Sequence, residues 1–109
     1  MAYDEKLAQR VRRALGNMEG VGEKKMFGGL CFMLNGNMLC GVEKDMLMLR
    51  VGKEAYENAL QQPHCRVMDF TGRPLAGYVT VAPSGLGTAR ALKRVLERGL
   101  TFVPTLPPP

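Results

Sequence analysis

The sequence has no tryptophan, one histidine, and only three tyrosines and four phenylalanines among its 109 residues. With so few aromatic rings, the chain offers little surface on which the bases of a single-stranded nucleic acid could stack. The histidine, His64, stands beside Pro63, and neither a serine elbow motif nor a carboxylate pair in a signature context accompanies it. We therefore expect no catalytic residues and no enzymatic activity.

Cysteine is also scarce, and its count of three is odd. An odd number of cysteines is typical of a protein from a reducing compartment. Together with His64 the cysteines would make four zinc ligands, but structural zinc sites pair ligands about two to four residues apart. Eight residues lie between Cys31 and Cys40, whereas His64 and Cys65 are adjacent. We expect no metal and no other cofactor.

Long hydrophobic runs are missing as well, and the first twenty residues are interrupted by charged side chains at helical spacing. Neither a bilayer-spanning helix nor a secretory signal fits this pattern. We expect a soluble, cytoplasmic protein that does not contact membranes. The length suits one domain, predicted here as residues 1–104, followed by a proline-rich tail at 105–109.

The net positive charge is concentrated in the second part of the chain. Residues 1–64 hold nine Lys/Arg against eight Asp/Glu, whereas residues 65–109 hold six against two. Four of these six side chains fall in the last predicted helix, namely Arg90, Lys93, Arg94 and Arg98. They are the candidate contact residues for nucleic acid or another acidic partner, although a solvated helix face would have the same composition.

Apolar residues near the N-terminus recur at spacings of three and four, which predicts a helix over residues 3–15 with one buried stripe. Asp4 and Glu5 favour its N-terminal end, and Gly16 favours its termination. The predicted buried stripe consists of Tyr3, Leu7, Val11, Ala14, Leu15 and Met18. The opposite face carries Lys6, Arg10, Arg13 and Asn17, a stripe whose role stays open.

Short β-prone segments follow at residues 23–27, 30–34, 38–42 and 46–51. Asn35-Gly36 predicts a two-residue hairpin turn, because both positions tolerate positive φ. This turn would pair Leu34 with Asn37, Met33 with Met38, Phe32 with Leu39 and Cys31 with Cys40. The two cysteines would then occupy a non-hydrogen-bonded site that permits a disulfide, although a reducing compartment favours free thiols.

The remaining elements complete an α+β fold. A short helix opens at Gly52 and ends before Pro63, two strands are expected at 66–70 and 76–82 around a turn-rich linker, and a last helix spans 87–103. Gly99 inside this helix predicts close packing of the helix on the sheet. The predicted fold is an antiparallel sheet of five to six strands covered by an N-terminal, a short middle and a C-terminal helix.

Five of the eight methionines fall in the predicted strands between residues 23 and 51, namely Met26, Met33, Met38, Met46 and Met48. Methionine in strands fills gaps in a core or lines an adaptable binding surface. A second copy of the chain could cover an exposed strand edge and a methionine-rich surface, so we expect a homodimer.

The segment KKMFGGLCFMLNGNMLCGV, the LMLRV strand after it and the later RVMDFTGRPLAGYVTV resemble the N-terminal domain of the TfoX/Sxy competence regulators. This resemblance covers nearly the whole chain and implies an antiparallel sheet covered by helices. For the founding regulators it implies a role in switching on natural-transformation genes alongside the cyclic-AMP receptor protein. Those regulators continue into a C-terminal domain, whereas this sequence ends in Pro-Pro-Pro, so fold alone does not transfer their function.

Two functional hypotheses follow. The first is a non-enzymatic regulatory adaptor that binds another protein, such as a transcription factor, through a sheet face or an edge strand. The second is a weak nucleic-acid-binding domain that uses the basic C-terminal helix. The first is favoured, because the sequence contains neither a helix-turn-helix nor a zinc finger and its basic patch is modest.

Overall fold

The computed structural model describes residues 3–26, 28–69 and 74–109. The elements in chain order are α1 (Glu5–Leu15), β1 (Val21–Met26), β2 (Gly29–Leu34), β3 (Asn37–Glu43), β4 (Met46–Arg50), α2 (Tyr56–Leu60), β5 (Cys65–Val67), β6 (Tyr78–Val81), a 3₁₀ turn η1 (Pro83–Gly85), α3 (Ala89–Phe102) and a second 3₁₀ turn η2 (Val103–Thr105). Within the described ranges, no helix is long and apolar enough to cross a membrane.

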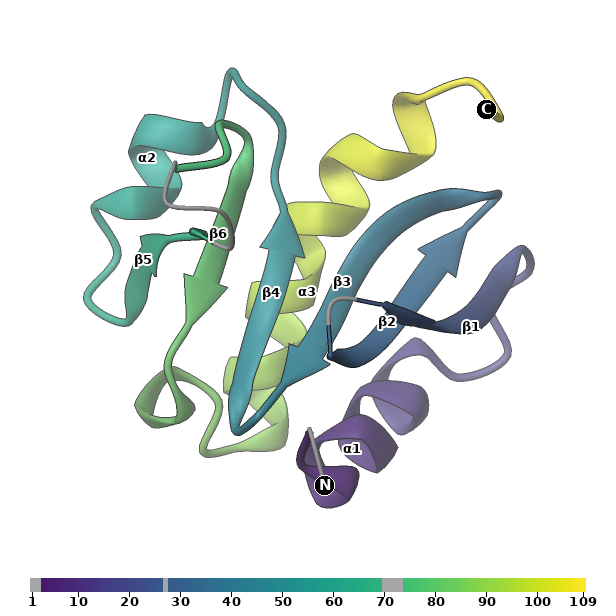
Figure 1. Cartoon of the computed structure of the whole chain (residues 1–109), viewed down its shortest axis with the longest axis horizontal. Helices are drawn as coiled ribbons and strands as arrows, with labels where there is room; N and C mark the ends of the chain where they lie inside the picture. The colour runs from purple at the N-terminus through teal and green to yellow at the C-terminus, as the bar shows by residue number, and fades with distance from the viewer. Residues whose placement is uncertain (1–2, 27, 70–73) are drawn as a thin grey trace.

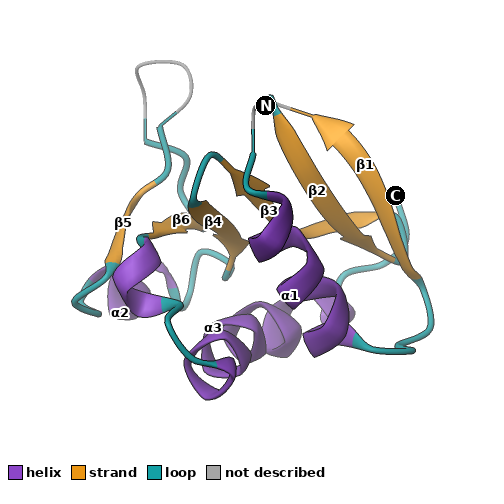
Figure 2. Ribbon diagram, turned by 90° about the horizontal axis from the view of Figure 1, so that it is seen from below, coloured by secondary structure: helices purple, strands orange, loops and turns teal. Residues whose placement is uncertain are grey.

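The six strands form one antiparallel sheet in the order β1-β2-β3-β4-β6-β5 (Figure 1). Helices α1 and α3 lie against the same face of this sheet, and α2 packs beside β5 and β6 (Figure 2). The predicted α+β fold, with its N-terminal, short middle and C-terminal helices, is therefore confirmed.

Helix α1 begins and ends at the residues that the sequence indicated, within two positions. The Asp4 carboxylate accepts hydrogen bonds from the backbone N–H groups of Lys6 (2.8 Å) and Leu7 (3.3 Å), which satisfies two free donors of the first turn. Gly16 ends the helix with φ of 58°. The prediction that Met18 belongs to the buried stripe is wrong, because Met18 follows the end of α1 and its residue surface is 39% exposed.

The hairpin of β2 and β3 has the predicted turn. Asn35 and Gly36 both adopt positive φ, and Leu34 pairs with Asn37 and Met33 with Met38. Beyond these pairs a β-bulge shifts the register by one residue, so that Leu39 has no single partner.

The bulge overturns the two outer predicted pairs. Phe32 lies opposite Cys40, and Cys31 lies opposite Gly41. The prediction that Cys31 and Cys40 face each other is therefore wrong, and both thiols are free.

Helix α3 packs closely on the sheet at Gly99, as predicted. A Cβ atom at this position would lie 2.9 Å from Leu49 Cδ1, 3.0 Å from Leu39 Cδ1 and 3.2 Å from the Arg50 carbonyl oxygen. The α-helix ends at Phe102, and the chain continues through Pro104 in the 3₁₀ turn η2. Pro104 thus lies just beyond the end of the α-helix, inside η2.

The later elements are shorter than predicted. Helix α2 has only five residues, β5 has three and β6 has four. Part of the predicted strand 66–70 and of the turn-rich linker lies outside the described residues. Near the C-terminus, the Asn37 side-chain amide donates to the Pro107 carbonyl (3.1 Å), which places this segment against the β2–β3 turn.

The sheet separates two groups of buried side chains. The main core lies between the sheet and the helices and is formed largely by leucine and valine. The other face holds Cys31, Met38, Met48 and Met68, all buried, with Met26 and Met33 half-buried beside them. The prediction that strand methionines pack in a core is confirmed for Met38 and Met48.

A candidate basic surface formed by two helices

Arg10 ties helix α1 to the start of helix α3. Its Nη2 donates to the carbonyl oxygens of Leu86 and Thr88, the latter at 3.3 Å. Thr88 is the N-cap of α3, since its hydroxyl accepts a hydrogen bond from the Ala91 N–H (3.0 Å). Two helices that are 73 residues apart along the chain are therefore held side by side (Figure 2).

A hollow of about 400 Å³ lies between the two helices. Its lining comes from α1 with Arg10, Arg13 and Ala14 and from α3 with Ala89, Leu92 and Lys93. An adjoining hollow is lined by Ala89, Arg90, Lys93, Arg94 and Glu97. We call the five positive side chains of these hollows, Arg10, Arg13, Arg90, Lys93 and Arg94, the two-helix basic surface.

A positive side chain at the start of α3 is unfavourable with respect to the helix dipole. An α-helix carries a partial positive charge at its N-terminus, so acidic side chains are favourable there and basic ones are not. Helix α1 follows this rule, with Glu5 in its first turn and Arg12 and Arg13 in its last. Helix α3 has no acidic residue in its first turn, and Arg90 stands there. The helix dipole therefore does not account for the position of Arg90.

Arg12 belongs to α1 but not to the two-helix basic surface. Its Nε and Nη2 donate to the two carboxylate oxygens of Glu23 on β1, at 2.6 and 2.9 Å. This bidentate pair lowers the pKa of the Glu23 carboxyl, and the hydrogen bond to Glu23 raises the pKa of Arg12. The charge of Arg12 is thus balanced within the domain.

The four candidate residues of the C-terminal helix divide into two groups. Arg90, Lys93 and Arg94 lie together on the two-helix basic surface. Arg98 lies apart from them, because its Nη1 donates to the Asn58 side chain (3.4 Å) and it lines a different cleft.

Arg10 and Arg13 were not among the candidates that the sequence offered for this surface. Both lie on one face of the first predicted helix, but no sequence signal joins that face to the last helix. The periodicity of each helix gives its own exposed stripe, whereas the contact of Arg10 with Leu86 and Thr88 is decided by the fold.

The described residues contain one pairing that resembles a nucleophile with a base. The Ser84 hydroxyl lies 2.9 Å from His64 Nδ1, at an exposed site. A catalytic pair of this kind needs a third group that orients the histidine, and among the described residues no carboxylate accepts a hydrogen bond from His64. Nor does this part of the chain gather three His, Cys, Asp or Glu side chains that could hold a metal ion.

Comparison with known proteins identifies one match. The model of the TfoX N-terminal domain family matches residues 5–103, nearly the whole chain. Neither a curated protein nor a solved structure matches the chain significantly.

Proposed function

Because the chain belongs to the TfoX N-terminal domain family, we propose that it is a non-enzymatic, cytoplasmic adaptor in transcriptional regulation that binds an acidic segment of a partner protein. The partner would lie along the two-helix basic surface. The family match supports the general kind of domain, and the charge and shape of the surface support the choice of ligand.

The observation that carries the proposal is a hollow lined by both apolar and positive side chains. Ala14, Ala89 and Leu92 share this lining with Arg13 of α1 and Lys93 of α3. An amphipathic acidic segment can place apolar side chains against the former and carboxylates against the latter. Phosphate groups of a duplex would use only the cations, since backbone contacts to nucleic acid are electrostatic.

Nucleic-acid binding is the alternative that the same cations support. A surface with five positive side chains and one carboxylate, Glu97, would bind duplex DNA weakly and without sequence preference. Such binding falls steeply as salt is raised, because it depends on the release of counterions.

The test is photo-crosslinking from within the hollow. A photoreactive amino acid replaces Ala89, which is exposed and lines both hollows, and the labelled protein is irradiated in a lysate of its native host. The same residue in place of Leu75, which is 47% exposed and outside both hollows, is the control site. We expect an acidic protein to be crosslinked from position 89 and not from position 75.

Charge reversal then tests specificity. The variant Arg13→Glu/Lys93→Glu/Arg94→Glu should lose the crosslinked protein. A control variant, Lys24→Glu/Lys44→Glu/Arg66→Glu, changes net charge equally at exposed positions elsewhere and should keep it. Sequence-specific nanomolar binding of duplex DNA at physiological salt, abolished by the first variant alone, would support the nucleic-acid alternative instead.

A further inference from the structure

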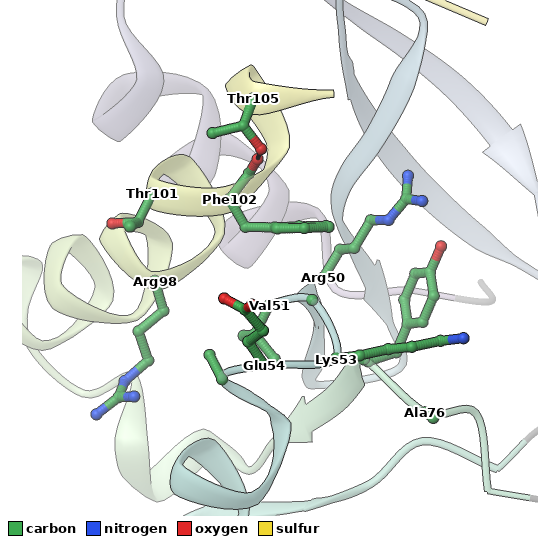
Figure 3. A pocket seen from close by; sticks show the side chains of 13 residues that line it. Arg50, Val51, Lys53, Glu54, Ala76, Arg98, Thr101, Phe102 and Thr105 are labelled. Carbon is green, nitrogen blue, oxygen red and sulfur yellow. Dashed lines mark hydrogen bonds between the residues drawn. The ribbon is translucent and has the colours of Figure 1, made fainter. Parts of the chain in front are cut away.

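A larger cleft lies at the other end of helix α3, where the ends of β4 and β6 meet the C-terminal turn of that helix (Figure 3). Its volume is about 690 Å³, which falls within the range of about 300–1,000 Å³ that is typical of small-molecule sites. The cleft shares no lining residue with the two-helix basic surface.

Two glycines shape the floor of this cleft. Gly52 and Gly77 both adopt positive φ, and the N–H groups of Val51 and Gly52 both donate to the Gly77 carbonyl, at 2.8 and 3.0 Å. A Cβ atom on Gly52 would lie 2.6 Å from a ring carbon of Phe102. The phenyl ring therefore rests directly on the Gly52 backbone, and the floor is fixed by backbone contacts rather than by side-chain packing alone.

Arg50 is held at the cleft by two aromatic rings. Its guanidinium carbon lies 5.4 Å from the centre of the Tyr78 ring and 5.9 Å from that of Phe102. Contacts of this kind fix the orientation of the guanidinium without using its N–H donors. Among the described residues, no hydrogen bond or ion pair engages the Arg50 side chain, since the ion pair there is that of Arg12 with Glu23. Within this part of the chain its forked donors are therefore available to a ligand.

The other charged residues of the cleft are unevenly placed. Lys53 and Arg98 add two cations, and Glu54 adds one carboxylate. In Figure 3 the side chains of Arg50 and Lys53 extend to the same side, whereas that of Arg98 extends to the opposite side. The positive charge available to one ligand therefore comes from Arg50 and Lys53.

We propose that this cleft binds a small organic anion, a carboxylate or phosphate attached to a short apolar body. The fork of Arg50 matches the paired oxygens of either group, and Lys53 supplies a second point charge. The apolar body lies against Phe102 and the small side chains of Ala55 and Ala76, which line the same cleft.

The experiment follows backbone amide shifts of the ¹⁵N-labelled full chain during titration with three probes. Phenyl phosphate and phenylacetate present the two anions on the same ring, and benzyl alcohol presents the ring without charge. We expect saturable shifts at Gly52, Lys53 and Gly77 with at least one anion, and at least tenfold weaker binding of the alcohol. Comparison of the two anions shows which group the cleft prefers.

Substitutions separate binding from folding. Arg50→Met should weaken anion binding at least tenfold, while Arg50→Lys keeps part of it. Because Arg50 also contacts two rings, Lys53→Met serves as a second variant at an exposed position and should weaken binding several-fold. Lys24→Met, on β1, is the matched control and should bind as the unmodified protein does.

Three results would overturn the proposal. These are that the anions shift no cleft amides, that they bind no better than the alcohol, or that they bind Lys53→Met and the unmodified protein equally. A purely structural role of Arg50 predicts a loss of stability on substitution with no response to anions. The variant Arg13→Glu/Lys93→Glu/Arg94→Glu should keep its anion affinity, so failure here is distinguishable from failure of the adaptor proposal.

Discussion

Cys31 and Cys40 lie on adjacent strands but on opposite faces of the sheet. Cys31, Gly41 and Met48 form one row across β2, β3 and β4, while Phe32, Cys40 and Leu49 form the next row. Side chains of neighbouring rows point to opposite faces, so Cys31 packs with the methionines and Cys40 with the main core. One extra residue, Leu39, separates two thiols that a regular hairpin would place opposite each other.

The first prediction concerns thiol reactivity. Burial raises the pKa of all three thiols, but Cys31 and Cys40 are buried whereas Cys65 is only half-buried. At pH 8 the native protein should therefore react with iodoacetamide first at Cys65, the thiol that the reagent can reach. Mass spectrometry of the labelled peptides measures this order. All three thiols should react alike in denaturant, and a Cys31–Cys40 disulfide in the purified protein would contradict the structure.

The same burial predicts a loss of stability at high pH. The folded pKa of Cys40 is raised, so its contribution to stability is fully present below the pKa of an unfolded thiol, about 8.5, and is lost as pH rises above that value. The slope for one such group is about 1.4 kcal/mol per pH unit. Urea unfolding from pH 8 to 10 should show a shallower fall for Cys40→Ala than for the unmodified protein.

The second prediction is that Gly99→Ala destabilises the domain despite alanine's higher helix propensity. The gain of about 1 kcal/mol in propensity is opposed by overpacking of about 1–3 kcal/mol. Leu49 and Leu39 can shift, but the Arg50 carbonyl at 3.2 Å is backbone and cannot move cheaply. We expect a net loss of about 1 kcal/mol by urea unfolding. Increased stability would show that α3 is free to move away from the sheet.

The third prediction is that Arg90→Glu stabilises the protein while weakening the proposed partner contact. An acidic side chain in the first turn of α3 suits the helix dipole, for a gain of about 0.3–1 kcal/mol. The gain should shrink at high salt. Arg66→Glu makes the same charge change on β5 and is the control for net charge. A destabilised Arg90→Glu variant would show that Arg90 has a structural role.

The fourth prediction concerns Glu23 and acid. Its pKa is lowered by Arg12, so the stabilisation is present above the unfolded carboxyl pKa of about 4.3 and is lost as pH falls. Because both side chains are more than a third exposed, we expect Glu23→Gln to cost less than about 1 kcal/mol at pH 7. Unfolding at pH 7 and pH 3 measures the difference, which should vanish at the lower pH. Glu19→Gln should show no such pattern.

The fifth prediction is self-association. Strand β1 is six residues long and lies at one edge of the sheet, so its outer backbone groups could pair with a second copy. We expect light scattering at micromolar concentration to return twice the 12.0 kDa mass of the chain. A proline in place of Lys24 should then reduce dimer formation if β1 is the contact. The monomer mass would contradict the prediction.

The sequence by itself determined the features that depend on near neighbours. The Asn35-Gly36 turn and the Gly16 helix end could be predicted because each rests on the φ angles of one or two residues. The order and type of the elements followed from hydrophobic period, and Gly99 indicated a close approach of helix and sheet because a missing Cβ leaves room for it.

Only the tertiary structure decided the features that join distant segments. The bulge at Leu39 places Cys31 and Cys40 on opposite faces of the sheet, and no turn signal encodes it. Arg13 and Lys93 line one hollow where Arg10 binds the loop before α3, and the cleft at Arg50 brings Phe102 of α3 against Gly52. Such contacts depend on side chains far apart along the chain, so periodicity and composition carry no record of them.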